Sequence, residues 1–394
     1  MSTTDAMTFL RLIPWICDIA CGATLGSLIS SYLSGSAPKL FAYQHGAKTH
    51  AILCAALLYI SVKLIALVWR SRASGKEKKS MYGLEHGRLH LQVPTAMWMN
   101  MGYWRRNCGT QTLAEACRDL LKMVLREAGF KREDERAGTA KSTRRKKMLI
   151  DVGFGCGEQT IYMMSDAPIR SSDQEWWDER EFCPRFDHYI GITNNTTQHR
   201  HASRRVQDLL SGGKEGTIES NISLFCADAA KPASWNDDIK KSIDQTLEAD
   251  PERWIMALDT AYHFSPTRWP LVEYAYGIQA SFMAFDLCIS PTARFKQKLI
   301  MRILTSLMRA PWENFVTPEE YKNKLTAIGY SPSAIKIVDV SEHVFGHLAR
   351  YLEEQDRRLK SLGFGIGAFE VAKTMFGWWG RSGVVRGIIV VARR

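Results

Sequence analysis

Three closely spaced glycines form the part of this sequence that most directly indicates chemistry. They lie in the stretch MLIDVGFGCGEQ and are Gly153, Gly155 and Gly157. The apolar residues before Asp151 are typical of a buried parallel strand, and the residues from Glu158 onward are typical of a helix. Glycines at such a turn remove Cβ atoms, so a ligand can lie directly against the backbone.

The spacing of these glycines differs from that of a dinucleotide site. Dinucleotide sites use the pattern G-x-G-x-x-G and hold a pyrophosphate at a helix N-terminus. Here the pattern is D-x-G-x-G-x-G, with an acid beside the loop. An acid favours a cationic ligand over a phosphate. The loop therefore predicts a nucleotide-type site for a positively charged ligand, and a glycine-rich structural turn is the alternative.

Three later segments place polar side chains at the ends of expected strands. The segments are His188–Thr193, Ile222–Asp228 and Trp254–Phe264. Because ligands bind at the carboxyl edge of a parallel sheet, we expect Asp259, Tyr262 and His263 to point at the reacting centre. Histidine has the right ordinary pKa to take a proton near pH 7, so His263 is the candidate base. A histidine held by hydrogen bonds in a loop is the alternative.

Together these stretches resemble the motifs of class I S-adenosylmethionine-dependent methyltransferases, in particular the cyclopropane-synthase and sterol-methyltransferase-like small-molecule subgroup. The glycine loop resembles the first motif of the class, and GITNNTTQ resembles G-[IV]-T-x-S-x-x-Q. The stretch ALDTAYHFSPTR resembles A-x-[ED]-x-[AC]-[FY]-H-F-x-x-[TR]-R. The resemblance covers roughly Tyr82–Arg394, and it is specific in the glycine loop and in ALDTAYHF. It implies S-adenosylmethionine as the cofactor.

The resemblance also implies which residues hold each end of the cofactor. At the methionine end, Asp151 helps to hold the amino group beside the three glycines of the loop. At the adenosine end, Gln198 lies near the ribose and adenine, and Asp228 accepts a hydrogen bond from the adenine amine. Asp228 taken alone could equally be a turn or helix-cap residue. Thr193 stands where many class I enzymes carry a ribose-binding carboxylate, which puts that contact in doubt.

An aromatic stretch upstream, MWMNMGYW, is similar to the N-GYW segment that closes over the cofactor in these enzymes. Tyr103 lies in this segment and is expected, with Asp259, to contact the cofactor. Aromatic core packing is the alternative. A cap over the active site is expected near residues 295–309, where an amphipathic helix is rich in Met, Leu and Ile. Such a cap suits an apolar substrate, although ordinary packing explains the pattern equally well.

Strands alternate with helices from residue 148 to the end, which predicts an α/β fold. We expect a Rossmann-like, mostly parallel seven-stranded sheet flanked by helices, and the resemblance implies the methyltransferase strand order with an antiparallel hairpin at the end. The predicted organisation is a membrane anchor and basic linker (1–79), a helical lid and charged linker (80–147), and the catalytic core (148–394).

The N-terminal region carries two apolar segments, Thr8–Leu33 and Ala51–Trp69. The second approaches the length of about 20 residues that a bilayer helix needs. Lys63 lies near the middle of this segment, where a lysine raises the free energy of membrane insertion by about 2.5–3.5 kcal/mol. A buried or interfacial helix of a soluble protein is therefore the alternative. Basic residues after Trp69 favour a cytosolic location for the rest of the chain. We expect a membrane-anchored protein with a cytosol-facing catalytic domain, at the endoplasmic reticulum or another internal membrane.

The net charge and the cysteine spacing indicate which kinds of partner the chain can bind. The formal charge of +11 and pI near 9.2 predict affinity for an acidic surface. Beside apolar segments, anionic lipid is favoured over nucleic acid, since no aromatic-interleaved basic repeat accompanies the charge. The nine scattered cysteines show neither a C-x-x-C pair nor metal-ligand spacing, so neither disulfides nor a metal is expected.

The sequence thus predicts a methyltransferase that acts on a hydrophobic small molecule or lipid, such as a sterol, isoprenoid or secondary metabolite, at a membrane. One rival is a cofactor-binding but inactive membrane scaffold. The other is an NAD(P)-dependent oxidoreductase, which the glycine spacing disfavours. The methylated atom and the oligomeric state stay open.

Overall fold

A computed structural model describes residues 96–105, 111–130, 145–165, 186–210, 221–248 and 250–394. They belong to one compact unit, Gly87–Arg394. The expected membrane segments Thr8–Leu33 and Ala51–Trp69, and the domain boundary near residue 79, lie outside the described residues and stay predictions. Among the helices that are described, none combines the length and the apolar character needed to cross a bilayer.

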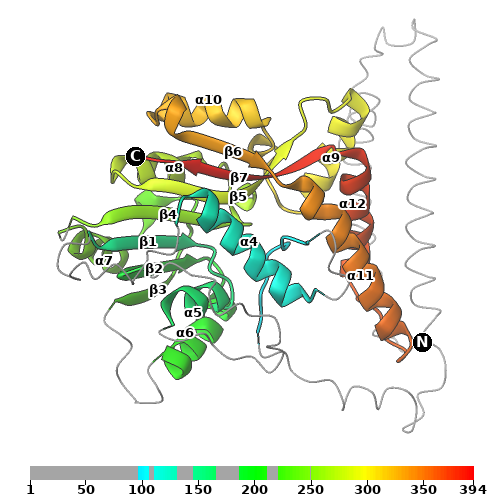
Figure 1. Cartoon of the computed structure of the whole chain (residues 1–394), viewed down its shortest axis with the longest axis horizontal. Coiled ribbons are helices and arrows are strands. Elements are labelled where there is room, and N and C mark those ends of the chain that lie inside the picture. The colour runs from blue at the N-terminus through cyan, green and yellow to red at the C-terminus, as the bar shows by residue number, and fades with distance from the viewer. Residues whose placement is uncertain (1–95, 106–110, 131–144, 166–185, 211–220, 249) are drawn as a thin grey trace, which may run out of the picture. The chain divides into compact units, whose positions relative to one another are not determined.

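The described unit is built on a seven-stranded sheet with the order β3-β2-β1-β4-β5-β7-β6 (Figure 1). β7 runs antiparallel to both of its neighbours, whereas the other neighbouring strands are parallel. The strands are β1 (Lys147–Val152), β2 (His188–Thr193), β3 (Ile222–Cys226), β4 (Glu252–Leu258), β5 (Ser281–Ile289), β6 (Ile335–Asp339) and β7 (Val385–Ala392). This confirms the predicted mostly parallel sheet that ends in an antiparallel hairpin.

Helices cover both faces of the sheet. Successive side chains of a strand point to opposite faces, and both sets are apolar here, so each face needs a covering layer. In β1, Met148, Ile150 and Val152 pack in the cluster under α7, α8 and α10, whereas Leu149 packs in the opposite cluster with α4 and α5. The helices are α4 (Leu113–Glu127), α5 (Glu158–Met164), α6 (Thr196–Leu210), α7 (Asp237–Leu247), α8 (Trp269–Gly277), α9 (Phe295–Leu307), α10 (Pro318–Ile328), α11 (Phe345–Lys360) and α12 (Phe369–Ser382). The result is a three-layer Rossmann-like α/β sandwich.

Local sequence signals determine several helix ends. Thr112 and Glu115 form a capping box at the start of α4, and Thr317 and Glu320 form another at α10. The buried face of α4 packs in the same core as the sheet, so this part of the predicted lid region belongs to the core.

The glycine-rich stretch before β7 contains a helix, α12, packed along α11 (Figure 1). A Cβ on Gly380 would lie 2.9 Å from the backbone nitrogen of Gly346, so this glycine permits the close approach of the two helices.

The direction of chain crossovers reverses between β1 and β4. From β1 the chain winds outward to β2 and β3, and it then returns to place β4 on the other side of β1. Ligands of doubly wound sheets bind in the crevice that such a reversal opens at the carboxyl ends of the strands. The carboxyl ends of β1, β2 and β4 are therefore where the fold places a ligand.

Candidate cofactor site

A cavity of about 450 Å³ lies at this reversal, within the range of about 300–1,000 Å³ typical of small-molecule sites. Seven of the residues predicted from sequence line it together: Gly153, Gly155, Thr193, Gln198, Asp228, Asp259 and His263. They come from segments as much as 110 residues apart and meet because their strands end at one edge. The prediction that these segments form a common site is therefore supported by their placement.

The glycine loop forms one wall of the cavity with its backbone. Gly153 and Gly155 have φ of +79° and +62°, values that residues with a Cβ rarely adopt. A Cβ on Gly153 would lie 2.6 Å from Thr260 Oγ1, whereas one on Gly155 would meet only Met99 Sδ at 3.7 Å. Gly153 is thus required by packing, and Gly155 leaves open space on the ligand side.

Gly157 has a different role from its neighbours. It caps α5 with φ of +90°, and a Cβ there would lie 3.0 Å from the Cβ of Ala202 in α6. It does not line the cavity and has a packing role at the α5–α6 interface, and its predicted contact with a cofactor stays a prediction.

Asp151 is fully buried and does not line the cavity. Its carboxylate accepts hydrogen bonds from Gln159 Nε2, at 2.8 and 2.7 Å, and from the Tyr189 hydroxyl. Burial raises its pKa to about 7, and these two hydrogen bonds act in the opposite direction. The predicted contact of Asp151 with a methionine amino group stays a prediction. In the described structure, Asp151 fixes Gln159, which does line the cavity.

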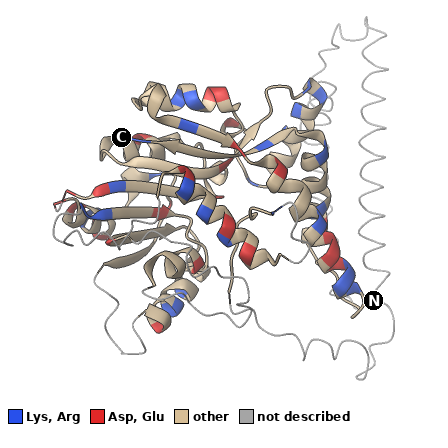
Figure 2. Ribbon diagram, in the orientation of Figure 1, with Lys and Arg blue, Asp and Glu red and all other residues tan. Residues whose placement is uncertain are grey.

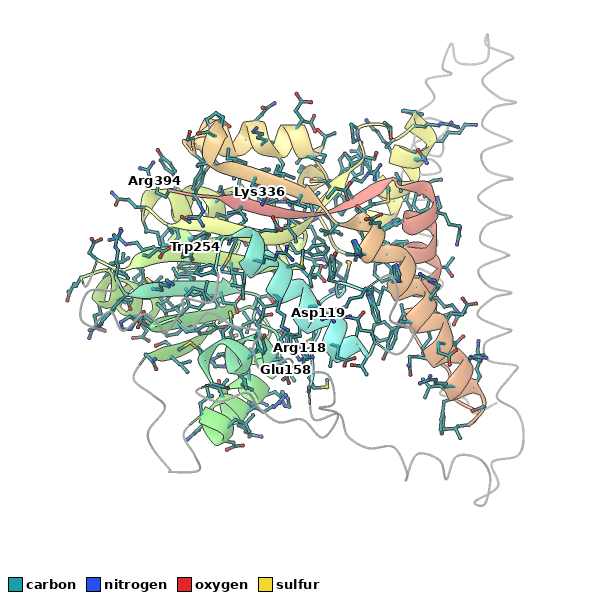
Figure 3. All side chains as sticks on the ribbon, in the orientation of Figure 1. Arg118, Asp119, Glu158, Trp254, Lys336 and Arg394 are labelled. Carbon is teal, nitrogen blue, oxygen red and sulfur yellow. The ribbon has the colours of Figure 1, made fainter. Side chains whose placement is uncertain are left out.

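A segment upstream of α4 crosses the cavity and is held by a carboxylate at each end. The Met97 N–H donates to Glu158 Oε1 at 2.7 Å, and the Met101 N–H donates to Asp259 Oδ2 at 2.6 Å. Between these anchors, Trp98, Met99 and Asn100 line the cavity. Figure 3 labels Glu158 at the start of α5, where it also pairs with Arg205 of α6.

Tyr103 does not reach the cavity. Its ring stacks on His343 with the centroids 4.4 Å apart, and its carbonyl accepts from Gln111 Nε2. The preceding residues 97–100 line the cavity, and Tyr103 holds the far end of that segment against the 3₁₀ turn Ser341–His343. The predicted contact of Tyr103 with a cofactor stays a prediction.

Asp259 combines backbone strain with an unsatisfied carboxylate oxygen. It follows β4 with φ of +58°, a left-handed conformation that is costly for a residue with a Cβ. Burial raises its pKa to about 7, although the Met101 amide and the Tyr262 hydroxyl favour its charged form. Its Oδ1 is buried and has no hydrogen-bond partner in the part of the chain that the structure describes. A ligand donor in the adjacent cavity would satisfy it.

The opposite end of the cavity carries neutral polar groups and one ion pair. Thr193 Oγ1 lies 3.4 Å from Gln198 Oε1, and Gln198 Nε2 lies 3.5 Å from Met99 Sδ. Asp228 accepts from the Ala230 N–H at 2.9 Å and pairs with Lys231 at 3.2 Å. The Ala230 hydrogen bond is the turn role that was the alternative for Asp228, and the residue also lines the cavity.

His263 lies in the 3₁₀ turn Ala261–His263 after β4 and lines the cavity. Partial burial lowers the pKa of its imidazole below the ordinary 6.5, and a hydrogen bond to the backbone of Arg309 acts in the opposite direction. The ring is therefore neutral at pH 7 and is able to accept a proton. Tyr262 is buried under this turn, 4.3 Å from His263 between ring centroids, and does not line the cavity.

A buried ion pair holds the His263 loop, and sequence reasoning missed it. Arg268 pairs with Asp286 of β5, and both side chains are fully buried. Arg268 also donates to the carbonyl of Asn314, whose Nδ2 donates to the carbonyls of Tyr262 and Phe264 at 3.1 and 2.8 Å. The arginine that ends the ALDTAYHFSPTR motif was the available signal, but its partners are set by tertiary structure.

Charge decides which ligand the cavity favours. Its lining carries the carboxyl groups of Glu158, Asp228 and Asp259. Glu158 pairs with Arg205 and Asp228 pairs with Lys231, so Asp259 is the lining carboxyl group for which the described residues provide no ion pair. A ligand cation beside Asp259 would favour its charged form, whereas a pyrophosphate would be repelled by it. The glycine wall and the unpartnered Asp259 oxygen thus fit a cationic nucleoside such as S-adenosylmethionine.

No family model and no curated protein matches this chain. Among similar solved structures, a putative sarcosine dimethylglycine methyltransferase from Galdieria sulphuraria is 11% identical, with a TM-score of 0.49 and coverage of 75% of this chain and 92% of that chain. The cyclopropane synthase MmaA2 from Mycobacterium tuberculosis is 13% identical, with a TM-score of 0.48 and coverage of 75% and 90%. The cyclase SpnF is 13% identical, with a TM-score of 0.44 and coverage of 79% and 91%. These likenesses are too distant to fix a family or an activity, so function has to be argued from the chemistry of the site.

Proposed function

We propose that this chain is an S-adenosylmethionine-dependent methyltransferase acting on a hydrophobic small molecule or lipid, such as a sterol, an isoprenoid or a secondary metabolite. The observation that carries the proposal is the cavity at the carboxyl ends of β1, β2 and β4, in which a glycine wall faces an acidic lining. When bound there, the cofactor supplies a sulfonium methyl group for in-line displacement by a substrate oxygen, nitrogen or carbon.

Different residues would bind the two ends of the cofactor. The backbone at Gly155 leaves room for the close approach of a ligand, and the free oxygen of Asp259 offers an acceptor for an ammonium donor. Thr193 and Gln198 present neutral polar groups to a ribose, and Asp228 offers an acceptor to a base amine. Since the leaving thioether is neutral, alignment of the acceptor accounts for most of the rate.

His263 is the residue that we propose to accept a proton from the acceptor. It lines the cavity, and its lowered pKa keeps it neutral at physiological pH. The buried Tyr262 is better placed to position the loop than to touch the reacting atoms. The apolar lining residues Trp98, Phe154 and Phe264 suit an acceptor with a hydrocarbon body.

A membrane setting is part of the proposal. It rests on the apolar segments of the N-terminal sequence and the net charge of +11, and it places the catalytic unit on the cytosolic side of the endoplasmic reticulum or another internal membrane.

Methyl transfer is the direct test. Full-length protein in detergent is incubated with S-adenosylmethionine carrying an isotopically labelled methyl group and with sterol, isoprenoid and phospholipid fractions. We expect label in an apolar fraction, and none with a Gly155→Val variant, whose side chain would enter the cavity. Turnover on polar acceptors alone would contradict the proposed substrate class.

Neither rival would label any fraction, so a binding measurement has to separate them. An inactive scaffold would bind S-adenosylmethionine without transferring its methyl group. A nicotinamide oxidoreductase would bind NAD(P) in competition with S-adenosylmethionine, and the lining offers its pyrophosphate only Lys231, which is already paired with Asp228.

A further inference from the structure

Helix α9 presents an apolar face to solvent. Phe295, Leu299, Ile303 and Leu307 repeat every four residues and form one stripe along the helix, with Ile300 beside it. Phe295 and Leu307 are 80% and 76% exposed, the highest values among the large apolar residues of the described chain. Scattered exposed leucines are normal, but a continuous stripe of five large residues marks an interaction surface.

The opposite face of α9 fixes the helix to the protein. Met301 and Thr305 are buried, and Leu304 and Met308 pack against the core. The outward stripe is therefore not the side by which the helix folds onto the sheet. The expected cap over the active site would turn Leu307 inward, but Leu307 faces solvent, and no α9 residue lines the described cavity.

Basic residues surround the stripe, and α9 contains no acid. Lys298 and Arg302 lie along one edge, Lys296 lies within the exposed face, and Arg294 precedes the helix. In Figure 2, α9 accordingly shows blue segments without red. Apolar side chains flanked by lysine and arginine are the composition of a helix that lies in the interface of an anionic bilayer.

We propose that the stripe formed by Phe295, Leu299, Ile300, Ile303 and Leu307 docks on the surface of an anionic lipid bilayer. Apolar side chains enter the headgroup boundary, and the flanking cations pair with lipid phosphates and carboxylates. This contact is formed by residues of the unit Gly87–Arg394. It holds whether or not the cavity transfers methyl groups.

The position of α9 gives this contact a consequence for the site. The backbone of Arg309, two residues beyond the end of α9, contacts His263, which lines the cavity. A bilayer against α9 would therefore lie near the residue that we propose as the base.

Photocrosslinking tests the docking surface in full-length protein. A photoreactive phenylalanine analogue replaces Ile303 on α9, or Val371 on α12 as the matched control, since both are apolar and exposed. The protein is bound to vesicles of phosphatidylcholine with or without phosphatidylserine. Because the control shares any tethering by the N-terminal segments, proximity alone would label both positions equally.

We expect lipid crosslinks from position 303, several-fold more than from position 371 and more with phosphatidylserine present. Lys298→Gln and Arg302→Gln should each reduce crosslinking on anionic vesicles by about fivefold. Lys322→Gln on α10 should leave it unchanged. Equal labelling at both positions, or no dependence on anionic lipid, would overturn the proposal. Crosslinks from position 303 to a second copy of the chain would also overturn it, because the stripe would then be a dimer interface.

Discussion

Replacement of Arg268 by methionine should destabilise the protein and displace the loop that carries His263. The guanidinium is fully buried and pairs with Asp286, which would be left with the Tyr321 hydroxyl at 3.0 Å and the Leu287 N–H at 2.8 Å. Removing one partner of a buried ion pair lowers the free energy of unfolding by about 3–5 kcal/mol, a large part of the total of about 5–15 kcal/mol for a typical domain.

The pH dependence of that loss depends on Asp286. Burial raises its pKa and Arg268 lowers it, so the variant should have a pKa further above the ordinary 3.8. A carboxyl whose pKa is higher in the folded state binds more protons there, and its stability contribution falls as pH rises from the ordinary to the folded pKa. The deficit of Arg268→Met should therefore be smaller at pH 5 than at pH 8.

The assay is equilibrium unfolding of the full-length protein in detergent, with methyl transfer measured in parallel. The double variant Arg268→Met, Asp286→Leu should recover most of the stability, because no unpaired charge remains. Its activity should stay reduced, since Asn314 would lose the guanidinium that orients it under Tyr262. A loss below about 1 kcal/mol in the single variant, or full activity, would refute this account of the loop.

Three further predictions concern the cavity. Gly153→Ala should lower the stability measured by thermal unfolding by more than about 2 kcal/mol, because its Cβ would lie 2.6 Å from Thr260 Oγ1. Gly155→Ala should cost only the strain of the left-handed backbone, about 1 kcal/mol, and yet weaken cofactor binding. In the wild type, the free energy of unfolding should fall by about 4 kcal/mol as the pH rises from 3.8, the ordinary pKa of Asp151, to about 7, its pKa in the folded protein. This fall should be absent from the urea unfolding of Asp151→Asn, and an unaltered pH profile would contradict the prediction. His263→Gln should lower kcat by about 10²–10⁴-fold without changing cofactor affinity. It should also abolish the decrease in rate that protonation of His263 causes below pH 6.5. A full rate in this variant would exclude a base role.

The sequence was most informative where local rules apply. Alternating glycines after an apolar run located the turn between β1 and α5. Polar residues after strands could be assigned to one edge because parallel strands end together.

Side-chain direction was the part that local rules missed. Asp151 lies within β1, not after it, and shares the face of Leu149 under α5. On this face its carboxylate accepts hydrogen bonds from Gln159 and does not itself line the cavity. Contacts such as Met101 with Asp259, which are 158 residues apart, depend on tertiary packing and carry no local signal.

Calorimetric titration of full-length protein tests most directly whether the cavity is an S-adenosylmethionine site. S-adenosylmethionine, S-adenosylhomocysteine and NAD are compared in the wild type and in Asp259→Asn, which keeps the side-chain size but removes the charge beside the cavity. We predict micromolar binding of the first two ligands and, in the variant, a loss of at least about tenfold, the size expected when a charge-assisted hydrogen bond is lost. Tighter binding of NAD, or no binding of either sulfur ligand by well-folded protein, would contradict the assignment.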